Sequence, residues 1–535
     1  MDLIRQAPTK ACHNCRRRRL RCDRSVPSCH KCTSAGQECL GYGKLFKWAD
    51  GAASRGKLAG TLKQPPGSGR SSSSRAVRDD RSSASSVSSR ASTPAGPSSE
   101  MQMQLVHAGV AHLDPAQFEL STPWVLVDPV FQDIDAPYRY YLSYFTNRLC
   151  KDLVSWDLPD NNPFRTLVPL TKASPLLQHV IVAASAAHMS NLQRPPLAPS
   201  ASNAGTLVYP GSVEASRRTL IDALAAKQKA LRLLYRAVQD IDAVGSDVVL
   251  ASVLFLINVE LLESGKHGWK AHLEGAGRIL ACIQPTEGSN AALRDYIVSD
   301  CVIYYILASA FMPNAPAGGS AVQSPQASSM VRRAAANSYL CCPPEVLEIL
   351  LAAGRLSNVK TTDEASADAL ADAGLQLLRQ AQDLDITEWA LSIRAQPNLH
   401  DVPIDSRIHA GSAHRVAGAL YILQAVPCLR SMLPPDTRKD LEDQLFHHLA
   451  CVPDEDPNFK ATTWPGFIAG AEASNPERQE WVKHRLQRTV RLVPWGFIYT
   501  ALDTLDIIWG LQKEGKTQEG WVQTLKDPDM NFLIV

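Results

Sequence analysis

Six cysteines near the N-terminus have the residue type and the spacing of a metal site. They are separated by two, six, six, two and six residues, and five arginines lie between the second and the third. The six residues are Cys12, Cys15, Cys22, Cys29, Cys32 and Cys39. Each Cys-x-x-Cys pair can hold a metal ion through sulfur at about 2.3 Å, and one tetrahedral zinc ion needs four thiolates. Six sulfurs therefore predict two zinc ions per chain that share two of the thiolates.

The charge of such a centre explains the basic residues beside it. Two zinc ions and six thiolates sum to +4 − 6 = −2, and a desolvated negative charge favours cationic neighbours. The arginines at positions 16 to 19 and at 21 supply them. Because a chain shorter than about 40 residues buries too little apolar surface to fold alone, we expect metal binding to provide most of the folding free energy of this stretch.

Six cysteines have three other possible uses. A disulfide knot needs an oxidising compartment, but Met1 to Lys10 is short and polar and does not resemble a signal peptide. An iron–sulfur cluster also uses thiolates, yet the spacing and the arginine run fit it poorly. A zinc knot that binds only protein partners is the strongest alternative. His13 and His30 are expected to face solvent, because the sulfur count is already complete.

The stretch resembles the fungal binuclear zinc cluster transcription factors. The resemblance covers the run from Ala11 to Asp23, the loop proline Pro27, the second cysteine pair and the closing Cys39. It implies that Cys12 and Cys29 bridge the two metals. It also implies that Cys15 and Cys22 complete one zinc site, and that Cys32 and Cys39 complete the other.

DNA binding follows from the same resemblance. It implies base contacts from Arg18 and Arg19 and CGG-like, guanine-rich sites, and arginine can donate two hydrogen bonds to O6 and N7 of guanine. Phosphate contacts are expected from Arg16, Arg21 and Arg24. We expect one short helix from Cys15 to about Arg21 and a matching one from Thr33 to Gln37. The alternative use of the arginine run is a nuclear import signal, and both roles can coexist.

The rest of the chain divides by composition. Residues 1–90 carry 19 Lys and Arg against 6 Asp and Glu, or +13, whereas the remainder carries 36 against 47, or −11. We therefore expect a DNA-binding domain over residues 1–48, a disordered Ser/Arg-rich linker over 49–120 and a large all-α regulatory domain over 121–535. No sustained heptads occur between Gly43 and Asp114, so no coiled coil is predicted; either a homodimer forms through the large domain or the protein binds as a monomer.

Helical patterns dominate the large domain. They predict helices over 137–150, 174–188, 215–240, 247–263, 269–282, 292–311, 343–353, 365–384, 412–433, 436–450, 476–491 and 494–512, and an exposed loop over 313–335. The apolar run from Val248 to Leu262 is too short to span a membrane. The Pro-led, Ala-rich helix over 174–188, the helix over 227–240 and the stretch over 247–280 with Gly268-Trp269 and Gly275-Ala276-Gly277 together resemble the fungal-specific transcription factor regulatory domain. The match is diffuse over about 400 residues, and it implies a helical array that senses a signal or contacts partners.

No catalytic motif is visible in this domain, so we do not expect an enzyme. The adjacent His447 and His448 should diverge on a helix and lie at the surface, and Cys341 with Cys342 should be a buried or reduced pair. Residues 527–535 fit either an activation segment or a packed C-terminus. Together the patterns predict a nuclear, zinc-dependent regulator of RNA polymerase II transcription that binds double-stranded DNA, contacts co-regulators and controls a metabolic or biosynthetic gene set. The alternative is a zinc-dependent protein-interaction scaffold that does not bind DNA.

Overall fold

A computed structural model describes two compact units of the chain, Met1–His112 and Leu113–Val535. The described residues are 10–26, 28–35, 39, 131–132, 134–158, 160–194, 210–281, 291–313, 319–360, 363–515, 520–527 and 532–535. The predicted linker over 49–120 and the region searched for heptads lie outside them. Each unit is considered by itself below.

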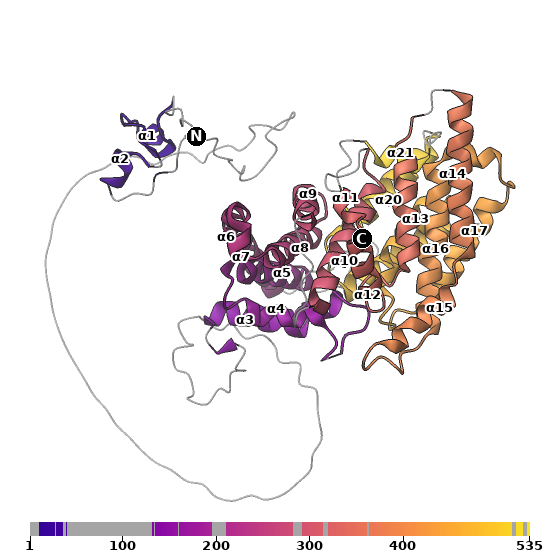
Figure 1. The fold of residues 1–535 in the computed structure, drawn as a ribbon, viewed down its shortest axis with the longest axis horizontal. Coiled ribbons are helices and arrows are strands. Elements are labelled where there is room, and N and C mark those ends of the chain that lie inside the picture. The colour runs from indigo at the N-terminus through magenta and orange to yellow at the C-terminus, as the bar shows by residue number, and fades with distance from the viewer. Residues whose placement is uncertain are drawn as a thin grey trace, which may run out of the picture. The chain divides into compact units, whose positions relative to one another are not determined.

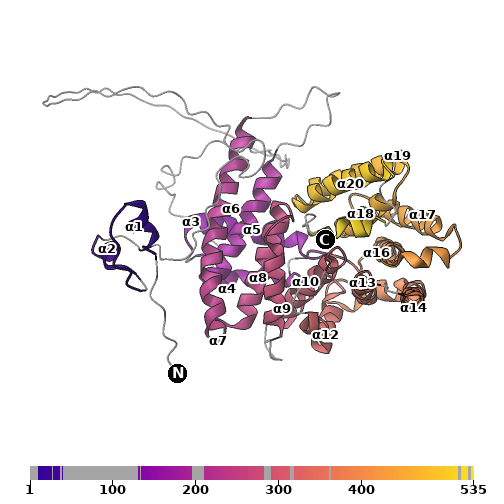
Figure 2. The same ribbon diagram turned by 90° about the horizontal axis from the view of Figure 1, so that it is seen from above.

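The first part of the second unit is a group of helices around α5 (Figures 1 and 2). Helix α5 packs against α3, α6 and α8, and α8 packs against α9. The longer helices are α3 (Ala136–Asn147), α5 (Pro175–Gln193), α6 (Pro210–Ala237), α8 (Ser246–Glu263) and α9 (Trp269–Leu280). Shorter elements join them, namely α4 (Leu167–Leu170), α7 (Ile241–Val244) and 3-10 turns over Leu149–Asp152, Pro163–Thr166 and Val238–Asp240.

Two of these helices show how sequence sets their position. The hydroxyl of Ser174 accepts a hydrogen bond from the N–H of Leu177 at 3.2 Å, and Pro175 occupies the first turn, so α5 begins where the cap predicted. Helix α8 is buried continuously from Val249 to Leu262, which identifies the long apolar run as a core helix. Within the described residues, no helix has both the length and the apolar character needed to cross a membrane.

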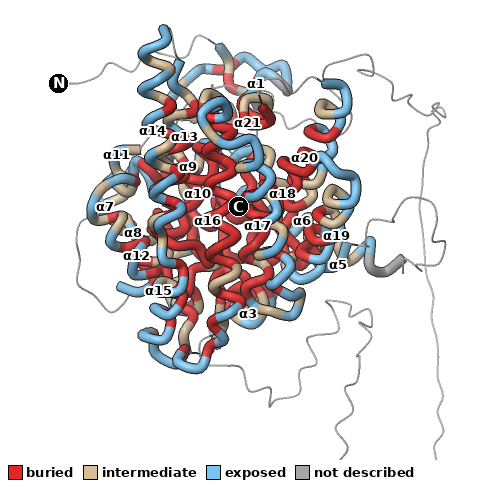
Figure 3. The backbone as a smooth tube through the Cα atoms, turned by 90° about the vertical axis from the view of Figure 1, so that its right-hand side faces the viewer, coloured by how far each residue is buried: buried red, intermediate tan, exposed pale blue. Residues whose placement is uncertain are grey.

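The second part of the unit is organised around α16, which packs against α13, α14, α15, α17 and α18. Figure 3 shows that the backbone of α10 and α16 is largely buried, while the outer helices expose one side. The helices are α10 (Ala291–Ser309), α11 (Gly319–Val322), α12 (Pro325–Ala334), α13 (Pro344–Leu356), α14 (Glu364–Asp383), α15 (Ile386–Leu391), α16 (Asp405–Ala425), α17 (Thr437–Ala450), α18 (Thr463–Glu472), α19 (Pro476–Leu492), α20 (Phe497–Lys513) and α21 (Trp521–Leu525). Short 3-10 turns cover Ser392–Ala395, Pro427–Ser431 and Lys460–Thr462.

The all-α prediction is confirmed, since extended pairing in the described residues is limited to one bridge between Val154 and Ser338. The loop predicted over 313–335 is wrong from Gly319 onward, where the structure has α11 and α12. Ser324 caps α12 by accepting a hydrogen bond from the N–H of Ala327, and this helix buries Met330 and Val331. Its small residues favoured a loop, but its apolar residues recur at helical spacing.

Other helices also differ from the prediction. Helix α16 begins at Asp405 rather than at Ser412, and it ends at Ala425 because Pro427 has no N–H to continue the helical hydrogen bonds. Helix α18 was not predicted at all. It contains Gly470, where a Cβ would lie 2.7 Å from Leu505, so glycine there permits close approach to α20.

A buried polar network joins the beginning of the second unit to its end. The carboxylate of Asp152 accepts hydrogen bonds from His188 Nε2 and Trp495 Nε1, each at 2.9 Å. The amide of Asn191 donates to the carbonyl of Leu262 at 2.6 Å and to that of Pro494 at 2.9 Å. The 3-10 turn Leu149–Asp152 and helix α5 are thereby bonded to the segment that leads into α20.

The C-terminal residues are also part of the core. Phe532, Leu533, Ile534 and Val535 are all buried, and the N–H of Leu533 donates to the carbonyl of Gly265 at 2.8 Å. For the described residues 532–535, the packed C-terminus is confirmed and an exposed activation segment is not.

Candidate metal centre and DNA-binding surface

Two short helices carry the two cysteine pairs. Helix α1 (His13–Arg17) begins after Cys12, whose sulfur accepts a hydrogen bond from the N–H of Cys15 at 3.4 Å. Helix α2 (His30–Thr33) begins after Cys29, which is its N-cap residue but makes no side-chain cap hydrogen bond. The first cysteine of each pair therefore lies at the cap of a helix, and the second lies within it. This arrangement corrects the predicted helices, which were placed over 15–21 and 33–37; positions 36–38 lie outside the described residues.

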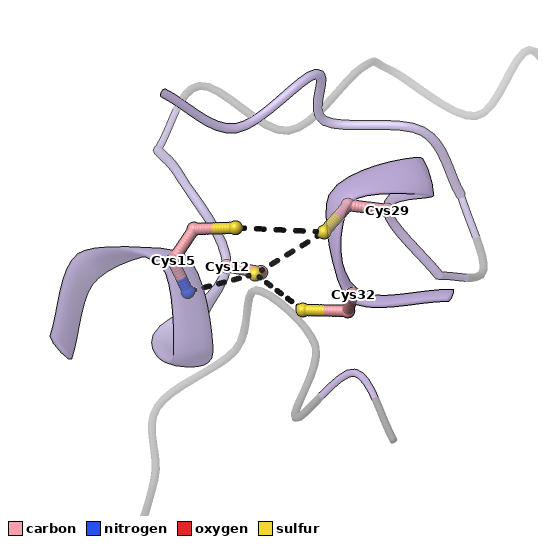
Figure 4. Close-up of side chains that lie close together, drawn as sticks. All are labelled: Cys12, Cys15, Cys29 and Cys32. Atoms are coloured by element: carbon pink, nitrogen blue, oxygen red, sulfur yellow. Dashed lines mark hydrogen bonds between the residues drawn. The ribbon is translucent and has the colours of Figure 1, made fainter. Parts of the chain in front are cut away.

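Four sulfurs converge between the two helices (Figure 4). Cys12 Sγ lies 3.5 Å from Cys29 Sγ and 3.7 Å from Cys32 Sγ, and Cys15 Sγ lies 3.7 Å from Cys29 Sγ. In a tetrahedron with zinc–sulfur bonds of about 2.3 Å, neighbouring sulfurs are about 3.8 Å apart. The observed spacing therefore fits thiolates that share a zinc ion.

The remaining two cysteines lie at the edge of this group. Cys22 Sγ accepts a hydrogen bond from the N–H of Cys12 at 3.4 Å, and it belongs with Cys29 to a second set of potential ligand atoms within 4.8 Å of one another. Cys39 is partly buried and packs against the other cysteines. Cys12 and Cys29 are central, because the sulfur of each lies beside both sulfurs of the opposite Cys-x-x-Cys pair.

Burial acts on the acidity of these thiols. It raises the pKa of Cys12, Cys15, Cys29 and Cys32. Burial also acts to raise the pKa of Cys22, but hydrogen bonds from the backbone N–H groups of Cys12 and Arg24 outweigh it and bring this pKa to about 7. Since the thiolate is the metal ligand, metal binding at this centre must release protons.

Asp23 connects the two halves of the centre, a role that the sequence did not reveal. Its carboxylate accepts a hydrogen bond from the N–H of His30 at 3.0 Å and another from the N–H of Lys31 at 3.3 Å, at the start of α2. It also accepts a hydrogen bond from the hydroxyl of Ser25. These bonds, led by that from Ser25, hold the pKa of Asp23 well below its usual range. An acidic residue directly after a ligand and shortly before a helix start is the signal that could have indicated this contact.

The predicted DNA-contacting arginines surround this centre on exposed backbone. Arg16, Arg18, Arg19, Arg21 and Arg24 are all exposed. Helix α1 ends in a Schellman turn, in which the N–H of Leu20 donates to Cys15 O at 2.9 Å and that of Arg19 to Arg16 O at 3.2 Å. Arg19 has φ +53° and so occupies the left-handed position where such turns usually place glycine. Arg24 has φ +59°. A residue other than glycine in this conformation carries backbone strain, which is typical of functional positions.

The structure also tests the predictions made for other histidines and cysteines. His30 is exposed, as expected. Cys341 and Cys342 are buried and reduced, as expected. His447 and His448 do not simply diverge: their rings lie 5.5 Å apart, and both rings contact His409 of α16. The expected divergence is therefore wrong, because both rings turn toward the neighbouring helix, whereas His447 is exposed as expected and His448 is half-buried.

Two family models match the chain. Residues 10–49 match the fungal Zn(2)-Cys(6) binuclear cluster domain, and residues 140–535 match the fungal specific transcription factor domain. The acriflavine sensitivity control protein acr-2 of Neurospora crassa is 30% identical, over 98% of this chain and 97% of that protein. No solved structure matches the chain.

These matches extend over most of the chain and include both the cysteine centre and the helical unit. They agree with the geometry of the sulfurs, which is that of a zinc-binding site. The chain belongs to the fungal zinc cluster transcription factors, a family of DNA-binding regulators of transcription and not of enzymes.

Proposed function

We propose that this chain binds G/C-rich, CGG-like sites in double-stranded DNA through a centre that holds two zinc ions. All six cysteines serve as ligands in this proposal, with Cys12 and Cys29 bridging the ions. The observation that carries it is the convergence of four buried sulfurs at distances of 3.5–3.7 Å directly beside an exposed arginine turn. A rigid, metal-held turn can present guanidinium groups to the major groove at fixed positions.

Each arginine has a separate role in this proposal. Arg18 and Arg19 contact guanine edges and set the sequence preference. Arg16, Arg21 and Arg24 contact phosphates and set affinity without reading sequence. Three phosphate contacts predict that the logarithm of the association constant falls with the logarithm of salt concentration with a slope of about −2.7.

The domain boundaries follow from this assignment. Residues 1–48 bind DNA in the nucleus, residues 49–120 act as a linker, and residues 121–535 form the regulatory domain that contacts co-regulators. The target genes are a metabolic or biosynthetic set. Because the N. crassa relative is named for control of acriflavine sensitivity, we include control of sensitivity to this compound among the functions of the chain.

The test is a duplex-binding array with purified full-length protein. Replacing Arg18 with Ala and Arg19 with Gly removes both guanidinium groups, and glycine is compatible with the left-handed backbone at position 19. We expect this variant to lose discrimination among duplexes by about tenfold or more, since a bidentate arginine–guanine contact provides about 1–3 kcal/mol. Its zinc content should equal that of the wild type.

The matched control is Arg379→Ala, which removes an exposed arginine on α14. Its binding should match the wild type. Unchanged selectivity in the Arg18/Arg19 variant would refute the assignment of base contacts. Equal affinity for every duplex, without the expected salt dependence, would instead favour a protein-interaction scaffold.

A further inference from the structure

Three histidines from two helices bring their ring nitrogens together in the second unit. His409 lies on α16, and His447 and His448 lie in the last turn of α17. One ring nitrogen of each lies within 4.8 Å of the other two, and the Nδ1 atoms of His409 and His448 are 3.0 Å apart. Two imidazole nitrogens at this distance share either a proton or a metal ion.

A thiol lies next to this group. Cys451 is the residue at which α17 ends, one helical turn after His447, and its Sγ lies 3.9 Å from His447 Nε2. Cys451 and His447 are exposed, whereas His409 and His448 are half-buried. The donor set thus opens to solvent on one side, which gives a metal ion access.

We propose that His409, His447 and His448 form a second metal site, which binds one divalent ion of the zinc type, with Cys451 beside His447 as its fourth ligand. Three imidazoles and one thiolate are ligands that zinc prefers, with bonds of about 2.0–2.1 Å to nitrogen and 2.3 Å to sulfur. Those bond lengths place neighbouring nitrogens about 3.3 Å apart, and nitrogen and sulfur about 3.6 Å apart. The observed 3.0 Å and 3.9 Å contacts lie within a few tenths of an ångström of these values.

The surroundings favour a cation at this point. The carbonyl end of a helix carries partial negative charge, and the group lies at that end of α17.

A hydrogen bond between His409 and His448 is the simplest alternative. It would satisfy these two rings, but it gives no reason for His447 to bring a ring nitrogen to the same point. A metal ion engages all three rings, can take the neighbouring thiolate as a fourth ligand, and connects α16 to the end of α17. Metal binding should therefore raise the unfolding temperature of the second unit as well as the metal content of the chain.

The experiment compares zinc content per chain in the full-length protein and its variants, after equilibration with zinc and removal of the excess. Wild type should hold one equivalent more than His409→Ala and than His447→Gln, whatever number the cysteine centre holds. His447→Gln changes an exposed side chain, so its loss of zinc would not be explained by misfolding, as a loss in His409→Ala could be. His484→Ala on α19, another exposed histidine, is the matched control and should retain the wild-type content.

Cobalt(II) tests the thiolate. The cobalt spectrum of wild type minus that of His447→Gln should show a sulfur-to-cobalt charge-transfer band. The band should be absent when Cys451→Ser takes the place of wild type in this comparison. Cys451→Ser should also bind cobalt at least about tenfold more weakly. The same variants should lose the metal-dependent rise in unfolding temperature of the second unit. Equal zinc content in wild type and both histidine variants would overturn the site. An unchanged cobalt spectrum in Cys451→Ser would overturn the assignment of the fourth ligand.

The difference measurement also separates this proposal from the proposed function. Loss of metal from the cysteine centre changes wild type and the histidine variants equally, and it abolishes DNA binding. Loss of the histidine site changes only the variants and leaves duplex selectivity intact.

Discussion

Replacing Asp152 with Ala should destabilise the second unit by about 3–5 kcal/mol, the range found when one partner of a buried charged pair is removed. Asp152 is buried, and its carboxylate accepts three hydrogen bonds. Two come from the buried His188 and Trp495 at 2.9 Å, and one comes from the Nη1 of Arg148 at 3.1 Å. His188 is in turn bonded to the hydroxyl of Tyr144 at 2.8 Å through its other nitrogen.

The magnitude follows from the donors that lose their acceptor. His188 Nε2 and Trp495 Nε1 remain buried without a partner in the variant, and each such group costs about 1–3 kcal/mol. Arg148 contributes less, since its side chain is 30% exposed and its Nη2 also bonds the carbonyl of Leu492. The sum of about 2–6 kcal/mol brackets the range expected from the buried pair.

Urea unfolding of the full-length chain measures this difference. Tryptophan fluorescence reports on tertiary packing, and circular dichroism reports on the helices. Arg148→Ala is the control and should cost at most about 1 kcal/mol, as partly exposed ion pairs do. A loss below about 1 kcal/mol in Asp152→Ala would refute the view that this network holds the two ends of the unit together.

The pH dependence has a defined sign. Burial acts to raise the pKa of Asp152, but the hydrogen bond and charge of His188, with Lys460 and Arg148, lower it below the ordinary value. A carboxyl with a lowered folded-state pKa stabilises the fold above its unfolded-state pKa, near 4, and this contribution is lost as the pH falls through the folded-state value. The stability difference between wild type and Asp152→Ala should therefore be full near pH 7 and shrink below about pH 4.

Three further predictions concern other parts of the molecule. Asp300 is fully buried with no hydrogen-bond partner for either carboxylate oxygen among the described residues, and burial raises its pKa well above the ordinary value. Wild type should therefore lose stability as the pH rises above about 4, whereas Asp300→Asn should lose less and should be more stable than wild type at neutral pH. Urea unfolding measures both effects, and a destabilised variant would contradict this. Gly496→Ala should cost about 1–3 kcal/mol, because its Cβ would lie 2.4 Å from the carbonyl oxygen of Glu263. Gly275→Ala should instead stabilise by about 0.5–1 kcal/mol in thermal unfolding, because Gly275 lies in the interior of α9 and a Cβ there would have nothing within 4 Å. Equal effects of the two changes would refute the packing at position 496. Chelation of zinc should abolish DNA binding while the helical circular dichroism signal of the second unit persists; parallel loss of both would show that the units do not fold separately.

Local signals in the sequence predicted much of the helical unit. Ser174 followed by Pro175 defined the start of α5, because the cap and the proline act within one turn. The continuous apolar run of α8 likewise required burial on all sides. Helix α18 escaped prediction because its glycines and Pro465 lower helix propensity. Its stability comes from packing against α17, α19 and α20, which lie elsewhere in the sequence.

In the candidate site, too, features set by neighbours in the chain were predicted, and features set by tertiary packing were not. The spacing of the cysteines was sufficient to predict a metal centre, since ligand chemistry depends on neighbours in the chain. The left-handed conformation of Arg19 and the hydrogen bonds of Asp23 were not predicted, because they depend on how the turn after α1 meets the start of α2. The meeting of His409 with His447 and His448 requires the packing of α16 on α17 and leaves no local pattern.

The bonds between the start and the end of the second unit determine which fragments of this protein are usable as baits or crystallisation targets. A fragment that begins after Asp152 or stops before Trp495 leaves a buried donor or acceptor of the other segment stranded in apolar surroundings. Removing Leu533 deprives the carbonyl of Gly265 of its donor. Truncation series across residues 136–535 should therefore give insoluble or chaperone-bound products, and an apparent loss of partner binding in such a series would reflect unfolding before it reflects the loss of a docking site.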